Sequence, residues 1–180
     1  MNEIQEDHLT NTEKNLVAMG AAMGAGCRIS ADKLHGIALS LRIPEGDIAE
    51  AFRWGLDAKG EAVGTMQRKV ATLIGDNPEK QAPILAGNAG AIASLARIAA
   101  FVAANSAPDA LAEISQARAQ GITAGQIQLC ISLAKMVRRN AQAFSDQELA
   151  EHVCGIEPGE EASCCLPGPS ARNAVACSCT

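Results

Sequence analysis

The amino-acid sequence repeats itself, without a gap, at an interval of 79 residues. The identical pairs are Leu16 and Leu95, Ala21 and Ala100, Ala25 and Ala104, Ala31 and Ala110, Ala38 and Ala117, Ile43 and Ile122, Gly46 and Gly125, and Ile48 and Ile127. Alanine matches carry little weight in a chain this rich in alanine, so the Ile-x-x-Gly-x-Ile pattern of residues 43–48 and 122–127 is the stronger part. Because stacking would bury faces that neither half can bury alone, the repeat predicts one domain, residues 1–153, built from halves at about 11–74 and 83–145.

Each half carries the residue spacing of α-helices. In the first half, Leu16, Met19 and Met23 lie on one helical stripe, and Gly20 and Gly24 make a small face beside it that another helix can approach closely. Aromatic residues make up only 2% of the chain, which disfavours β-sheets. The sequence therefore predicts an all-α fold of two similar helical repeats.

Further helices are expected along the first half. One covers about residues 31–41, another begins with Pro44 as an early helical residue, and a further helical stretch runs to about Leu73. The Gly-Asp-Asn-Pro sequence at 75–78 ends this half, and Pro83 is expected to start the next.

Charge and hydropathy exclude several classes of partner. The net charge of −5 argues against nucleic acid, whose phosphates require a concentrated basic face. The acidic, polar N-terminus does not resemble a signal peptide, and the apolar run 91–104 is interrupted by Ser94 and Arg97. We therefore expect a cytoplasmic protein without a membrane partner, in which the seven cysteines serve as thiols, redox groups or metal ligands.

Short motifs give the chain a family resemblance over roughly residues 11–142. The small-residue approach Ala21-Ala22-Met23-Gly24-Ala25-Gly26-Cys27 and the Gly-containing turns at 43–51 and 121–127 resemble the carboxymuconolactone decarboxylase and alkylhydroperoxidase D superfamily. The resemblance implies a helical homo-oligomer, a trimer or hexamer. For the peroxidase members it also implies two cysteines of a Cys-x-x-Cys-x-x-x-His motif as the redox pair, with the His and an upstream Glu moving protons.

The first half keeps only part of that motif. Cys27 matches its first cysteine, Ser30 stands at the second, Leu34 stands at the histidine, and His35 comes one residue later. Along one helix, eight residues separate Cys27 from His35, about 12 Å of rise. The nearest upstream carboxylate is Glu13, whose spacing also differs. Cys27 is either a small packing residue at a helix junction or a single reactive thiolate that another thiol resolves.

The second half has no thiol at the matching positions. Ser106, Asp109 and Glu113 stand there, and Ser106-x-x-Asp109 predicts a helix cap. Cys130 lies in an apolar helix and is expected in the core, and Trp54 is expected to serve in packing.

The C-terminal segment, residues 154–180, is turn-rich, and we expect it to form a flexible tail. Cys164-Cys165 and Cys177-Ser178-Cys179 each present two sulfurs near one point, which suits soft ions such as Zn(II), Cu(I), As(III) or Hg(II). The same cysteines could instead resolve Cys27 by thiol–disulfide exchange, or they could have no role.

Two functions remain open from the sequence. The first is a thiol-dependent redox enzyme, a peroxidase or thiol–disulfide oxidoreductase, that needs no cofactor and reduces a small peroxide or a disulfide through Cys27 at the expense of a thiol reductant. In this hypothesis Ser30, His35 and Glu13 complete the site. The second is a non-catalytic soft-metal binder that uses the tail cysteines on an oligomeric helical scaffold.

Overall fold

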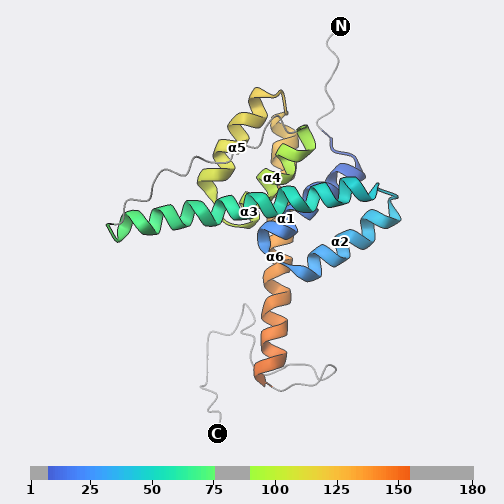
Figure 1. The fold of residues 1–180 in the computed structure, drawn as a ribbon. Coiled ribbons are helices and arrows are strands. Elements are labelled where there is room, and N and C mark those ends of the chain that lie inside the picture. Colours follow the sequence, from blue (N-terminus) through green and yellow to red (C-terminus); the bar gives the residue numbers. More distant parts are fainter. Residues whose placement is uncertain (1–7, 76–89, 155–180) are drawn as a thin grey trace, which may run out of the picture. The chain divides into compact units, whose positions relative to one another are not determined.

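The computed structural model describes residues 8–75 and 90–154, and every regular element in these ranges is an α-helix (Figure 1). The chain divides into two units, residues 1–144 and 145–180, which we describe separately. The prediction of an all-α fold is confirmed for the described residues. The helices are α1 (Asn11–Ala25), α2 (Arg28–Ser40), α3 (Glu45–Leu73), α4 (Ala91–Ala103), α5 (Ala107–Ala119) and α6 (Ala124–Cys154), the last of which continues into the second unit.

The 79-residue interval of the sequence reappears in the helices. Both ends of α5 follow the corresponding ends of α2 by 79 residues, and the first residues of α3 and α6 are separated by the same interval. Two left-handed backbone positions also match, since Gly26 pairs with Asn105 and Arg42 pairs with Gly121. The two halves therefore share helix bounds and turn conformations, as the sequence repeat predicts.

Helices α1 and α4 form the centre of the first unit, and nearly all of α4 is buried. A Cβ atom on Gly20 would lie 2.6 Å from the carbonyl oxygen of Ala96, and one on Gly24 would lie 2.6 Å from the Cα of Ala100. The predicted small face is thus the surface on which α4 packs, and the missing side chains let the two backbones come into contact. The first turn of α1 is closed by a reciprocal cap between Thr10 and Glu13.

The main core joins α1 and α4 to the first turns of α6. Its members include Val17 and Ala21 on α1, Leu95 and Ile98 on α4, and Cys130 on α6. The matched pairs Ile43 and Ile122, and Ile48 and Ile127, are all buried. The conserved spacing of the Ile-x-x-Gly-x-Ile pattern therefore has a packing reason, because each isoleucine fills the core of its own half.

Three helix boundaries differ from the sequence expectations. The helical stretches expected from Pro44 to Leu73 are one continuous helix, and Pro44 is its N-cap with an extended ψ of 140°. Helix α2 begins at Arg28, three residues earlier than expected, because Cys27 already caps it. Pro83, the expected start of the second half, lies outside the described residues.

Among the helices of residues 8–75 and 90–154, none combines the length and the hydropathy that a membrane span requires.

Candidate functional site

Cys27 occupies the N-cap position of α2, directly after the left-handed Gly26 that ends α1. Its Sγ accepts a hydrogen bond of 3.4 Å from the backbone N–H of Ser30, and only 8% of its surface is exposed. The N-terminal end of a helix carries a partial positive charge that favours an anionic sulfur. The fold thus brings Cys27 and Ser30 together in one helix cap.

Lys59 of α3 brings an ammonium group to the same turn. Its Nζ occupies the space that a Cβ atom on Gly26 would need. Gly26 also has a φ of +70°, so any other residue here would be both strained and crowded. Lys59 could not be identified from the sequence, because it lies on another helix and no motif spacing connects it to Cys27.

The other two residues expected at this site lie apart from Cys27. His35 is exposed and stands two turns further along α2. Glu13 lies at the opposite end of α1, about 21 Å of helical rise from Cys27, and its carboxylate accepts hydrogen bonds from the N–H and hydroxyl of Thr10. In this arrangement neither side chain can exchange a proton directly with Cys27.

Glu13 instead lines a surface cavity of about 360 Å³. The cavity lies between the starts of α1 and α4 and the first half of α3, which contributes Glu50 and Trp54. Trp54 also packs against a core cluster, as expected. Cys27 does not line the cavity, so any ligand of the two carboxylates would bind away from the thiol.

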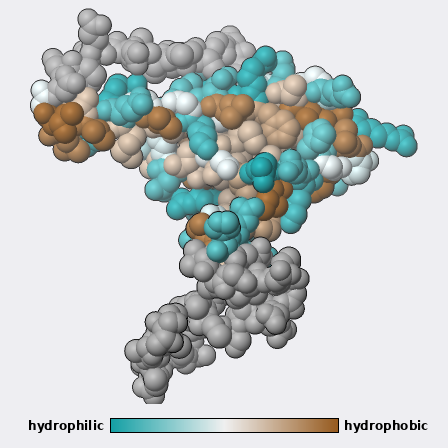
Figure 2. Space-filling view, turned by 60° about the horizontal axis from the view of Figure 1, so that its bottom comes forward, coloured by the Kyte–Doolittle hydropathy of each residue, from teal (hydrophilic) through white to brown (hydrophobic). Residues whose placement is uncertain are grey.

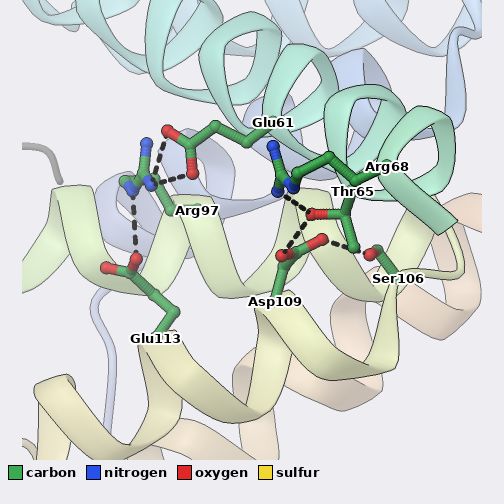
Figure 3. A network of polar contacts seen from close by, with 7 residues as sticks. All are labelled: Glu61, Thr65, Arg68, Arg97, Ser106, Asp109 and Glu113. Atoms are coloured by element: carbon green, nitrogen blue, oxygen red, sulfur yellow. Dashed lines mark hydrogen bonds and ion pairs between the residues drawn. The ribbon is translucent and has the colours of Figure 1, made fainter. Parts of the chain in front are cut away.

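A buried ion cluster joins α3, α4 and α5 (Figure 3). Arg97 of α4 is 4% exposed and binds Glu61 of α3 through both carboxylate oxygens, at 2.8 and 3.0 Å, and Glu113 of α5 at 3.2 Å. Burial by itself would lower the pKa of Arg97, but its hydrogen bonds and charge interactions with the two glutamates raise that pKa above its ordinary value. The guanidinium therefore stays charged and joins three helices.

Asp109 and Ser106 extend these contacts toward the end of α3. The Ser106 hydroxyl donates a hydrogen bond to Asp109, which also accepts one of 2.9 Å from Thr65, and Arg68 donates to Thr65 (Figure 3). Ser106 is the N-cap residue of α5, as expected, but its side chain makes no capping hydrogen bond. Its hydroxyl binds a carboxylate that is itself turned toward α3.

The two repeats therefore put different chemistry at equivalent positions. At the motif positions of the second half, Asp109 binds Ser106 and Thr65 of α3, and Glu113 binds Arg97 of α4. In the first half the equivalent residues are Cys27, Ser30 and Leu34, and Leu34 packs against the apolar core. The sequence identified these positions and the thiol of the first set, but only the fold shows that Glu113 of the second set binds Arg97 of α4.

Cys130 is a core residue, as predicted. It is fully buried, and its Sγ donates a hydrogen bond of 3.0 Å to the carbonyl of Leu95. Burial raises the pKa of the Cys130 thiol to about 12, so the group stays protonated at neutral pH. Of the two cysteines whose side chains the structure describes, Cys130 lies in the main core and Cys27 caps a helix.

Cys164, Cys165, Cys177 and Cys179 lie outside the described residues. Within the described residues no group of three or more His, Cys, Asp or Glu side chains could hold a metal ion.

Comparison with known proteins gave no match. No protein-family model, no curated protein and no solved structure matches this sequence.

Proposed function

We propose that the protein is a thiol-dependent redox enzyme that reduces a small peroxide through Cys27, in the manner that its resemblance to alkylhydroperoxidase D implies. The observation that carries this proposal is the position of the Cys27 sulfur. It caps α2, accepts the Ser30 N–H, and lies on the turn that the Lys59 ammonium contacts. A cation and a helix N-terminus together are the surroundings that favour reactive thiolates.

Each turnover of the proposed reaction consumes one peroxide and one molecule of an external dithiol. The Cys27 thiolate attacks one peroxide oxygen, the O–O bond breaks, and the leaving oxygen takes up a proton to give water or an alcohol. Cys27 is then a sulfenic acid, with which a tail thiol condenses to form a disulfide and a second water. A dithiol reductant restores both thiols by exchange. Because only 8% of Cys27 is exposed, hydrogen peroxide suits the site better than a bulky substrate.

Replacing Cys27 with serine tests the proposal. Consumption of hydrogen peroxide by the full chain with dithiothreitol is expected to fall to the rate of dithiothreitol alone, and the dimedone adduct of the sulfenic acid is expected to disappear from residue 27. Lys59→Gln keeps the sulfur but removes the cation, so alkylation of Cys27 should slow by about two- to fivefold, as expected for a charge interaction of about 0.5–1 kcal/mol.

Cys130→Ala is the matched control, since it removes the other described thiol from the core. It should leave peroxide consumption unchanged at a temperature at which the variant is folded. Consumption by Cys27→Ser that equals the wild-type rate would rule out the proposed nucleophile.

A second candidate function rests on the tail sequence. Cys164-Cys165 and Cys177-Ser178-Cys179 provide four thiolates, the number that encloses a tetrahedral zinc ion. The full chain should then retain about one equivalent of Zn(II) after gel filtration, measured by elemental mass spectrometry. Serine at all four positions should abolish retention, whereas Cys27→Ser should preserve it. Retention that survives the fourfold substitution would contradict a metal site on the tail.

A further inference from the structure

From Leu56 to its C-terminal end, α3 carries a stripe of exposed apolar side chains. Its members recur at intervals of three, four and seven residues and are between 47% and 74% exposed. They are Leu56, Val63, Met66, Val70, Leu73 and, at the C-cap, Ile74, and we call them the α3 stripe.

The adjacent face of the same helix is already packed against the first unit. Ala58 and Ala62 are buried, and Glu61 and Thr65 bind α4 and α5. Beyond Ala62, α3 has no buried residue and extends past the end of α5 (Figure 1). Hydrophobic residues gather on this projecting end, at the left of Figure 2. Spacings of three and four residues are those by which one helix packs along another.

We propose that a second copy of this chain covers the α3 stripe, so that two α3 helices pack antiparallel about a two-fold axis near Gly64. This register places Leu56 opposite Leu73 and Val63 opposite Met66 of the other copy. A contact of this kind is self-complementary, because each copy provides the same patch. The proposal does not depend on the reaction of Cys27.

The area of the stripe fits such a contact. A large aliphatic side chain that becomes fully buried loses about 60–120 Å² of accessible surface. Six partly exposed side chains on each of two copies therefore supply about 400–900 Å² of apolar area to one contact. About 57% of a typical interface is non-polar, so this apolar area corresponds to an interface of about 700–1,600 Å² in total. Specific interfaces bury about 1,200–2,000 Å².

Segments of the same chain match the stripe less well. Residues 76–89 contain two large aliphatic side chains, Ile84 and Leu85, together with two prolines, and residues 155–180 contain Ile156, Leu166 and Val175 spread among prolines and glycines. Neither segment repeats the stripe's spacing. A second copy offers six apolar side chains in the same spacing.

The subunit number of the full chain in reducing buffer tests the proposal, measured by light scattering during gel filtration. The wild type should be an even-numbered assembly, a dimer or a hexamer of three such pairs. Val63→Glu with Val70→Glu places two charges at the contact, so the mass should fall at least by half. Leu111→Glu with Met136→Glu changes two equally exposed apolar residues on α5 and α6 and should keep the wild-type mass.

Circular dichroism checks that each variant is folded, and Met66→Lys replaces the double variant if that protein does not fold. A monomeric or trimeric wild type would overturn the proposal, whether the chain's own segments or a foreign protein cover the stripe. A stripe variant that keeps the wild-type mass, or a control pair that loses it, would do the same.

Discussion

Replacing Arg97 with methionine should lower the free energy of unfolding by about 3–5 kcal/mol, the cost of removing one partner from a buried ion pair. The substitution leaves the carboxylates of Glu61 and Glu113 without their cation, between helices that exclude most water. The Glu113 side chain is 9% exposed and should account for most of the loss, whereas Glu61 is 23% exposed and partly screened. Urea unfolding followed by circular dichroism measures the difference.

Arg53→Met is the matched control for this substitution. Arg53 pairs with Glu50 at 3.2 Å, the same distance as one of the Arg97 contacts, but both side chains are more than half exposed. Its removal should change stability by no more than about 0.5 kcal/mol. Adding Glu61→Gln and Glu113→Gln to Arg97→Met should recover part of the loss, because no unpaired charge then remains. A loss below about 1 kcal/mol for Arg97→Met would show that the cluster does not join the helices.

Adding a single methyl group at Gly24 should destabilise the protein by about 1–3 kcal/mol, although alanine favours a helix over glycine by about 1 kcal/mol. The new Cβ would lie 2.6 Å from the Cα of Ala100. Since the obstacle is backbone, only separation of α1 from α4 relieves the overlap, and separation opens gaps in the main core. Thermal unfolding of Gly24→Ala measures the effect.

Gly36→Ala is expected to act in the opposite direction. Gly36 is exposed on α2, and no atom lies within 4 Å of a Cβ built there, so helix propensity alone should raise stability by about 0.5–1 kcal/mol. Equal effects of the two substitutions, in sign and size, would contradict the close contact between α1 and α4.

Much of the fold was predictable because local patterns determine it. Gly20 and Gly24 identified the contact face of α1, the two isoleucine patterns located equivalent turns, and Cys130 between apolar neighbours indicated a core thiol. Helix boundaries were less predictable. Pro44 and Cys27 are both N-caps, and their roles depend on which backbone N–H groups need a partner.

The candidate site was predictable only in part. Cys27 and Ser30 were identified from the family motif, and the structure places them together in one helix cap. His35 and Glu13 were expected beside them from the family motif, but both lie along helices whose rise takes them away from the sulfur. Lys59 was not identified, because it reaches the turn from α3.

By itself, the sequence determined the helical class and the duplicated plan, since helical periodicity acts over a few residues and the repeat can be read directly from the chain. Only the tertiary structure decided which groups meet across helices: Lys59 at the Cys27 turn, Arg97 between two glutamates, and the apolar stripe left uncovered on α3. Such contacts depend on how helices cross, and the crossing is set by side-chain shape and volume over the whole core rather than by any short pattern.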